Sequence, residues 1–379
     1  MPKTVIENLR DFGQSIWLDN ISRSLIASGR LKAMLAQGLS GVTSNPSIFD
    51  KAISQSKDYD ETIAQLYGKG KSVFEVYDGL TISDVQAAAD IFRPLYEKTG
   101  KLDGYVSLEI NPKLARLTQD TLEEGRRLWK KVNRPNLMLK VPATEEGFGA
   151  IEALLAEGMN VNATLIFSLE QYLEAAQAFL RGMRRLGDKG ARSGDARSVA
   201  SVFVSRTDTT IDAIMEQLIK NAPNQQEAAR LQSLRGKAAV SNCALIYGKF
   251  LEIFSSHEWK QLEGKGASLQ RIVWASTSSK NPRYSDIKYV SELISKDTVN
   301  TVPDNTFDAF LDHGIVKEAL TKDVTAAQIV IEELRTLNID INEVCLKLLN
   351  DGVIAFEKSF DSLLVSIEEK AKSASAVAV

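Results

Sequence analysis

The sequence predicts an α/β fold, a (β/α)8 barrel, from eight short apolar runs, the helical patterns between them, and the length of the chain. The runs are rich in Val, Ile and Leu and stand at about 15–19, 40–44, 104–110, 137–143, 160–167, 199–205, 271–276 and 298–302. Continuous apolar runs are typical of strands buried on both faces of a parallel sheet. Such a barrel occupies about 250 residues, and more than about 400 with insertions. One decorated barrel therefore accommodates all 379 residues.

The segments between the runs carry helix start signals. Ser83 with Gln86, and Ser168 with Gln171, match the capping box, in which two side chains and two backbone amides bond reciprocally. Apolar residues follow each box at helical spacing. Pro94 should kink or shorten the first of these helices, because proline lacks the amide hydrogen that continues the helix.

We expect a single domain over 1–379, with the barrel at about 15–320. A polar helical insertion is predicted at about 207–270, before the seventh strand, and a helical extension at about 322–372. A doubly wound open sheet is the alternative architecture. It calls for a phosphate loop after an early strand, and neither GxGxxG nor GxxxxGK[ST] occurs. The barrel is therefore favoured.

Composition excludes several classes of function. With 46 Lys and Arg against 49 Asp and Glu, the net charge of −3 lacks the basic excess that nucleic-acid binding requires. Two cysteines (Cys243, Cys345) and two histidines (His257, His313) form no metal or disulfide motif. No run approaches the roughly 18 apolar residues of a membrane span, and residues 1–13 have no signal-peptide pattern. We expect a reduced, cytoplasmic, soluble protein with no membrane or nucleic-acid partner and no metal.

Polar residues collect where the predicted strands end. In a (β/α)8 barrel, functional residues lie at the C-terminal ends of the strands, which face one another around one mouth. The residues at those ends supply a carboxylate base, an acid, an amine, an anion receptor and small hydrogen-bonding groups: Asp19, Asn45, Glu109, Lys140, Asn162, Thr164, Ser201, Arg206 and Ser276. Their convergence predicts a catalytic site.

Lys140 is the most informative of these residues. It stands between Leu139 and Val141 in LMLKVPA, where an ammonium would be poorly solvated. Burial disfavours the charged form of an amine, and a free amine in a pocket is the nucleophile that forms a Schiff base with a carbonyl substrate. A single lysine in an apolar run is more often structural, because it protects an edge strand or snorkels to solvent.

Structural explanations also exist for the other candidates. Asn45 precedes Pro46 and could simply cap a helix. Asp19 could cap the first helix, and Glu109 could be an ordinary solvated residue. Arg206 could pair with a surface carboxylate. Taken one at a time, each of these residues is explained without a substrate.

The motifs around these residues resemble the transaldolase family. Two signatures carry the resemblance: GVTSNPSIF (41–49), and LMLKVPATEEGFGAIEAL (137–154) around the lysine. Four further matches follow in the family's order: WLDN (17–20), SLEINP (107–112), VNATLIFS (161–168) and SVFVSR (201–206). The resemblance covers about 15–305, and the chain's length with WASTSSKNP (274–282) is similar to the longer bacterial subgroup. It favours the functional interpretation of Lys140.

The resemblance implies a role for each candidate. Lys140 would form an imine with a ketose phosphate, and Asp19 would be the base that drives cleavage between C3 and C4. Glu109, with a water placed by Thr164, would move protons during carbinolamine formation and breakdown. The substrate-holding residues would be Asn45, Asn162, Ser201 and, for the phosphate, Arg206. The sequence departs from shorter family members after the seventh strand, where Ser276, Ser278 or Lys280 stands in place of a second phosphate-binding arginine.

The implied activity is transaldolase, which exchanges a dihydroxyacetone unit between sugar phosphates in the non-oxidative pentose phosphate pathway. Fructose 6-phosphate and erythrose 4-phosphate would interconvert with sedoheptulose 7-phosphate and glyceraldehyde 3-phosphate. No cofactor is implied, and the assembly would be a monomer or homodimer. Two alternatives are an aldolase that releases free dihydroxyacetone and a non-catalytic barrel. Fructose-6-phosphate aldolases are much shorter chains, and a non-catalytic barrel should have lost Lys140, Asp19 or Glu109, all of which are present.

Overall fold

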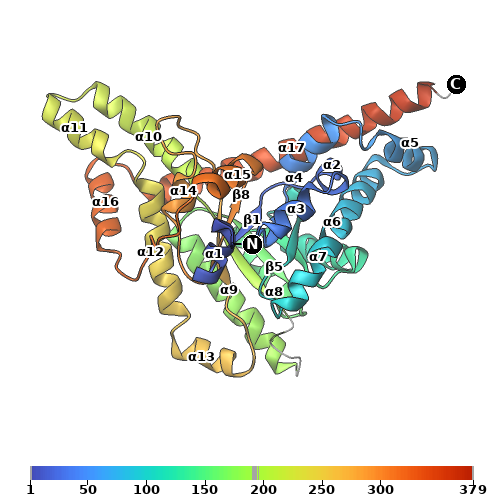
Figure 1. The fold of residues 1–379 in the computed structure, drawn as a ribbon, viewed down its shortest axis with the longest axis horizontal. Coiled ribbons are helices and arrows are strands. Elements are labelled where there is room, and N and C mark those ends of the chain that lie inside the picture. Colours follow the sequence, from blue (N-terminus) through green and yellow to red (C-terminus); the bar gives the residue numbers. More distant parts are fainter. Residues whose placement is uncertain (1, 190–193, 195, 378–379) are drawn as a thin grey trace.

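The eight strands close into a parallel barrel whose order follows the chain, and Figure 1 shows the helices arranged around it. The computed structural model describes residues 2–189, 194 and 196–377. The strands are β1 (Gln14–Leu18), β2 (Gly41–Thr43), β3 (Tyr105–Glu109), β4 (Leu137–Pro142), β5 (Val161–Ile166), β6 (Ser198–Phe203), β7 (Arg271–Ala275) and β8 (Thr298–Val302). β1 pairs with both β2 and β8, so the sheet has no open edge. The predicted (β/α)8 class is confirmed, and each predicted strand overlaps an observed one.

Helices surround the barrel and extend from it. The first half of the chain forms α1 (Val5–Phe12), α2 (Arg23–Ala27), α3 (Arg30–Ala36), α4 (Pro46–Ser54), α5 (Asp60–Gly68), α6 (Val73–Lys98), the short 3-10 helix η1 (Pro112–Leu114), α7 (Thr118–Val132), α8 (Glu145–Leu155) and α9 (Leu169–Asp188). The second half forms α10 (Ser205–Lys220), α11 (Gln225–Leu234), α12 (Ala238–Ile253), α13 (His257–Gly264), α14 (Lys288–Ser291), α15 (Asp304–His313), α16 (Thr325–Thr336) and α17 (Ile341–Val377). Among the described helices, none combines the length and apolar character needed to cross a membrane.

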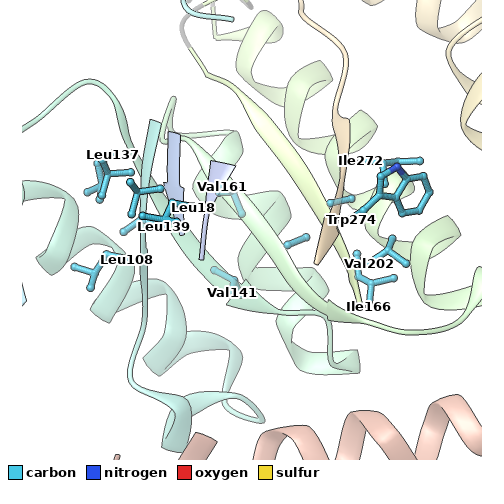
Figure 2. Close-up of a cluster of buried hydrophobic side chains, with 14 of the residues drawn as sticks. Leu18, Leu108, Leu137, Leu139, Val141, Val161, Ile166, Val202, Ile272 and Trp274 are labelled. Atoms are coloured by element: carbon cyan, nitrogen blue, oxygen red, sulfur yellow. The ribbon is translucent and has the colours of Figure 1, made fainter. Parts of the chain in front are cut away.

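Successive side chains along each strand point alternately toward the helices and into the barrel, which separates an outer apolar layer from the barrel interior. Outward side chains such as Leu139, Val161 and Val202 pack in the main hydrophobic cluster with the helices (Figure 2). A second cluster holds barrel side chains such as Trp17 and Met138. On β4 the side chain that follows Met138 on the same face belongs to Lys140, which brings the lysine into the barrel nearer its C-terminal end.

The strand register places polar side chains at one level. Lys140 pairs with Glu109 on β3 and with Asn162 on β5. Since neighbours in register on adjacent parallel strands point to the same face, all three side chains enter the barrel side by side. Gly41 on β2 leaves room for the Trp17 side chain, because a Cβ at this position would stand 2.8 Å from the Trp17 ring.

One predicted helix start is wrong. α6 begins after Ser72, whose side chain accepts from the Glu75 amide while the Glu75 carboxylate accepts from the Ser72 amide. The helix then runs through Ser83 and past Pro94 to Lys98. Ser83 follows an apolar stretch that packs in the core, so helical packing prevails over its capping tendency. The capping box of Ser168 and Gln171 is confirmed at the start of α9.

The predicted insertion and extension are both helical. α10 to α13 lie between β6 and β7, and α16 and α17 follow β8. α17 continues as helix to Val377, beyond the predicted end near 372. It packs on α4, α5, α6 and α10 and reaches β5 and η1 (Figure 1). The end of the chain therefore lies against elements from its first third.

Candidate functional site

A cavity of about 100 Å³ lies at the C-terminal ends of the strands. Its lining comes from β2, β4, β6, β7 and β8, from the segments that follow β1, β2 and β7, and from α4, α10 and α17. The lining residues are Asp19, Thr43, Asn45, Ser47, Lys140, Ser201, Phe203, Arg206, Ala275, Ser276, Thr301 and Phe356. Larger cavities occur elsewhere on the described surface. This is the one that contains Lys140, and it brings together predicted residues from both halves of the chain.

Lys140 is buried inside the barrel, with 3% of its surface exposed. Its Nζ donates to the main-chain carbonyl of Ser44 at 3.1 Å and lies 3.4 Å from Oε2 of Glu109. The closed barrel has no edge for this lysine to protect, and its amine does not reach bulk solvent. Both structural explanations are therefore excluded, and the amine is placed to meet a carbonyl group in the cavity.

Glu109 is buried beside Lys140, with 4% of its surface exposed, so it is not an ordinary solvated residue. Burial raises the pKa of its carboxyl group to about 7, although the charge of Lys140 opposes the shift. Apart from this ion pair, its two oxygens have no hydrogen-bond partner within the described residues. A carboxyl group that titrates near neutrality can both give and accept a proton during turnover.

Asp19 follows β1 and faces Lys140 from another part of the barrel. Its Oδ1 accepts from the Thr43 hydroxyl at 2.9 Å, and that hydroxyl lies 2.8 Å from the hydroxyl of Thr301. Burial raises the pKa of Asp19, and Lys140 and the Thr43 hydrogen bond oppose the rise. Asp19 does not cap the first helix, because Ser22 caps α2. Asp19 also lines a neighbouring cavity of about 350 Å³, so it borders open space on two sides.

A chain of hydrogen bonds fixes the amide beside Lys140. Asn162 donates from Nδ2 to the Ser107 hydroxyl at 3.1 Å and accepts at Oδ1 from the Ser201 hydroxyl at 2.7 Å. Thr164 lies farther along β5, where its hydroxyl is buried and has no partner among the described residues. A water held there would satisfy that hydroxyl.

Asn45 combines a structural contact with a place in the cavity. Its Oδ1 accepts from the Ile48 amide at 3.0 Å, with Pro46 in the first helical position of α4. The predicted capping role is confirmed. The cap uses the side-chain oxygen, and the amide nitrogen remains to donate to a ligand in the cavity.

Arg206 supplies the cation of the cavity. It lies in the first turn of α10, directly after β6, and its guanidinium stands 5.8 Å from the Phe203 ring centre. It is half-buried, and no hydrogen bond or ion pair engages it among the described residues, so the surface-pairing interpretation is wrong. An unpaired, partly desolvated guanidinium at a cavity wall is suited to bind an anionic group.

The loop after β7 contributes Ser276 to the lining of the cavity, and the charge of Lys280 helps to lower the pKa of Asp19 from outside that lining. Ser276 lines the cavity with a left-handed backbone (φ 55°), and its hydroxyl lies 3.2 Å from that of Ser205. Lys280 is exposed, donates to the Ser278 hydroxyl at 2.7 Å, and lines a separate cavity. In the phosphate region predicted from the sequence, Ser276 is therefore the residue in place beside Arg206.

Two tyrosine–aspartate hydrogen bonds hold this loop against α10. Tyr284 donates to Asp212 at 2.5 Å, and Tyr289 donates to Asp208 at 2.8 Å. Asp208 also accepts from the Ala239 amide at 2.8 Å, and burial raises the pKa of its carboxyl group to about 6. Because α10 begins with Ser205 and Arg206, this anchoring fixes the loop relative to the arginine.

Several residues of the site were not predicted. Thr43, Ser44 and Ser107 lie inside recognised motifs, so their sequence signal was available. Phe203 lies in SVFVSR, and Phe356 belongs to α17, which carries no motif. Cys243 and Cys345 are buried free thiols, and burial raises the pKa of both. No set of three or more metal-ligating side chains occurs among the residues that the structure describes.

Comparison with known proteins gives consistent results over nearly the whole chain. A family model described as Transaldolase/Fructose-6-phosphate aldolase matches residues 16–367. A transaldolase from Trichodesmium erythraeum is 44% identical over 370 residues, which cover 97% of each chain. A protein named transaldolase 2 from Nostoc punctiforme is 43% identical over 373 residues, with 97% of this chain and 98% of the relative covered. A transaldolase from Saccharopolyspora erythraea is 44% identical over 367 residues, covering 96% and 97%.

Proposed function

Because the chain belongs to the transaldolase/fructose-6-phosphate aldolase family, we propose that it is a transaldolase that works through a Schiff base on Lys140. The observation that carries the proposal is the buried amine of Lys140, 3.4 Å from the Glu109 carboxylate in a cavity that Asp19 also lines. A buried amine flanked by two carboxyl groups has the nucleophile and the proton carriers that imine chemistry requires.

Imine formation is the first stage of the proposed reaction. Lys140 first passes its proton to Glu109, and the resulting neutral amine attacks C2 of a ketose phosphate. The nitrogen then loses a proton and the carbonyl oxygen gains one, so that this oxygen becomes the hydroxyl of a carbinolamine. Glu109 donates a proton to that hydroxyl, which leaves as water and gives a protonated imine. A water held by the unpartnered hydroxyl of Thr164 relays the proton and later supplies the oxygen for hydrolysis.

Carbon–carbon cleavage is the second stage. Asp19 accepts the proton of the C4 hydroxyl, the bond between C3 and C4 breaks, and its electron pair moves into the protonated imine. The aldose phosphate leaves, and a three-carbon enamine remains on Lys140. The enamine then attacks the aldehyde carbon of a second aldose phosphate while Asp19 returns the proton to the new hydroxyl. Hydrolysis of the resulting imine releases the product ketose.

The remaining residues hold the substrate. Asn45, Asn162 and Ser201 are placed to bind hydroxyls of the three-carbon unit. Arg206 and Ser276 bind the phosphate, and Lys280, whose charge also acts on Asp19, adds positive charge from the loop. Because Arg206 has no ion-pair partner among the residues that the structure describes, phosphate binding breaks no ion pair there.

We propose the substrates of the non-oxidative pentose phosphate pathway: fructose 6-phosphate and erythrose 4-phosphate, interconverted with sedoheptulose 7-phosphate and glyceraldehyde 3-phosphate. The names of the relatives support the transfer reaction. The proposed chemistry uses side chains alone and no cofactor. We place the enzyme in the cytoplasm as a one-domain monomer or homodimer.

Borohydride trapping tests the mechanism. Fructose 6-phosphate and borohydride should leave a reduced three-carbon adduct on Lys140, identified by intact mass and peptide mapping. Lys140→Met should lose the adduct, and Lys280→Met, which removes a lysine near the cavity, should keep it. Absence of an adduct on the folded wild-type protein would contradict the Schiff-base mechanism and favour a binding role. An adduct together with free dihydroxyacetone at the transfer rate, without an acceptor, would favour an aldolase.

A further inference from the structure

The last helix supplies one wall of the cavity. Phe356 of α17 is 3% exposed, lines the cavity, and has its ring centre 6.0 Å from Nζ of Lys140. It belongs to a buried cluster that joins α17 to the ends of strands β5, β6 and β7 through residues such as Leu165, Phe203 and Ala275. An aromatic ring from outside the barrel therefore covers the amine.

Polar contacts on both sides of Phe356 hold α17 in place. The hydroxyls of Ser47 and Ser359 lie 2.7 Å apart, which connects α4 to α17 close to the cavity. Arg116 donates to Asn350 at 2.7 Å, one helical turn or more before the phenylalanine. The position of the ring is thus fixed from both directions along the helix.

Transfer requires the enamine on Lys140 to persist after the first aldehyde leaves. The competing process is protonation of the enamine carbon, followed by addition of water to the imine carbon, which restores the lysine amine and releases dihydroxyacetone. This process consumes one water molecule and needs no oxidant or acceptor. Imine hydrolysis uses the water held by Thr164, whereas further water that reaches the enamine carbon supplies its proton and commits the three-carbon unit to release.

We propose that Phe356 is a specificity-determining residue that favours transfer to an aldehyde over release to water. This inference rests on the proposed function and names a further residue for it. The Phe356 and Phe203 rings and Ala275 form an apolar wall of the cavity, and apolar side chains offer water no hydrogen bonds. A phosphorylated acceptor aldehyde can enter because Arg206 attracts it, whereas water has no comparable attraction to this wall.

The test measures the ratio of dihydroxyacetone release to transfer in wild type, Phe356→Leu and Phe356→Ala. Release from fructose 6-phosphate is followed without acceptor, and transfer is followed with erythrose 4-phosphate. The ratio should rise in that order and by about tenfold or more in Phe356→Ala, equivalent to about 1.4 kcal/mol in relative barrier height. If Phe356→Ala does not fold, the comparison of Phe356→Leu with wild type decides the outcome.

Phe360→Ala is the matched control. Phe360 is one turn farther along α17, is 2% exposed, and packs edge-on against Tyr77 at 5.1 Å rather than in the cavity. Its loss weakens the docking of the same helix, and the ratio should stay at the wild-type value. An unchanged ratio in the Phe356 variants, or an equal rise in Phe360→Ala, would overturn the inference.

Borohydride trapping of the same proteins distinguishes a failure of this inference from a failure of the proposed function. A wild-type adduct on Lys140 combined with an unchanged ratio in the Phe356 variants defeats this inference alone. The absence of a wild-type adduct defeats the proposed function and the inference with it. An adduct in every variant, with a raised ratio only at position 356, supports both.

Discussion

Lys140 and Glu109 are register partners on adjacent strands, and their Nζ and Oε2 atoms lie 3.4 Å apart inside a closed barrel. Neither side chain can move away from the other without leaving the interior, since both are almost completely buried. The two groups are therefore held side by side in the interior of the barrel.

The wild-type kcat for transfer should fall at acidic pH, and Glu109→Gln should remove this part of the pH profile. Burial raises the pKa of Glu109 to about 7, so the carboxylate that accepts a proton from water is lost as pH falls below 7. The wild-type kcat should fall on that side. The variant should lose about 10²–10⁴-fold in kcat, the usual contribution of a general acid–base group, and show no limb near 7. A limb that persists in Glu109→Gln would assign it to another group.

Asp19→Ala should separate imine formation from cleavage. Lys140 keeps its contacts with Ser44 and Glu109 in this variant, so the amine still attacks the ketose. Cleavage should slow by about 10²–10⁴-fold, because no base accepts the C4 proton. Borohydride should therefore trap an intact six-carbon adduct, visible by mass. Cleavage of fructose 6-phosphate at the wild-type rate would show that Asp19 is not the base.

Arg206→Ala should weaken binding of phosphorylated substrates specifically. Hydrogen bonds to charged groups contribute about 1.5–3 kcal/mol each, so the KM for fructose 6-phosphate should rise about 10- to 100-fold. The rate with unphosphorylated fructose should change little. Lys280→Ala is the comparison, and its effect should be smaller because that side chain is exposed and lines another cavity. Equal losses on both substrates would exclude a phosphate-binding role for Arg206.

Asp103→Asn should destabilise the barrel without changing its chemistry. Asp103 is 1% exposed and accepts from Nη1 of Arg271 at 3.1 Å, at the end of the barrel opposite the cavity. The substitution leaves a buried guanidinium without its counter-charge, which costs about 3–5 kcal/mol. Urea unfolding should detect the loss, and activity per folded molecule should be kept. Asp90→Asn, which breaks the exposed pair with Arg134, should lower the free energy of unfolding by only about 0–1 kcal/mol. Equal losses of stability in Asp103→Asn and Asp90→Asn would show that burial of the Asp103–Arg271 pair does not matter.

Asp208→Asn should alter how stability depends on pH. Burial raises the pKa of Asp208 to about 6, so between about pH 4 and 6 the folded protein holds a proton that the unfolded chain has released. Stability therefore falls as pH rises through this window, by at most about 1.4 kcal/mol per pH unit for one group. The variant lacks this contribution, and its stability relative to wild type should increase across the window. Parallel unfolding profiles for the two proteins would contradict the assigned shift.

The strands and most of the cavity residues could be predicted because parallel strands end at one mouth. Once Asp19, Lys140 and Arg206 are placed after or near the ends of apolar runs, closure of the barrel brings them together. Helix boundaries were less certain from sequence. Ser72 with Glu75 and Ser83 with Gln86 both match the same local capping pattern, and packing of the intervening segment selects the first.

Phe356 and Leu165 show why the rest could not be predicted. An apolar residue at helical spacing indicates that a face of α17 is buried, but the pattern does not say which surface covers it. Leu165 adopts a left-handed backbone (φ 57°) within β5, next to a shift in pairing register with β6, and leucine gives no local signal for that conformation. Both features depend on contacts formed only after the chain has folded.

The hydroxyl contact between Ser47 and Ser359 joins positions that are 312 residues apart in the chain. When the ribosome has synthesised all eight strands, it has not yet synthesised α17, the helix that packs over the strand ends. Until α17 docks, the apolar strand-end residues Leu165, Phe167 and Phe203 are open to chaperones and to other nascent chains. Burial of these strand-end residues therefore follows the synthesis of α17 rather than the closure of the barrel.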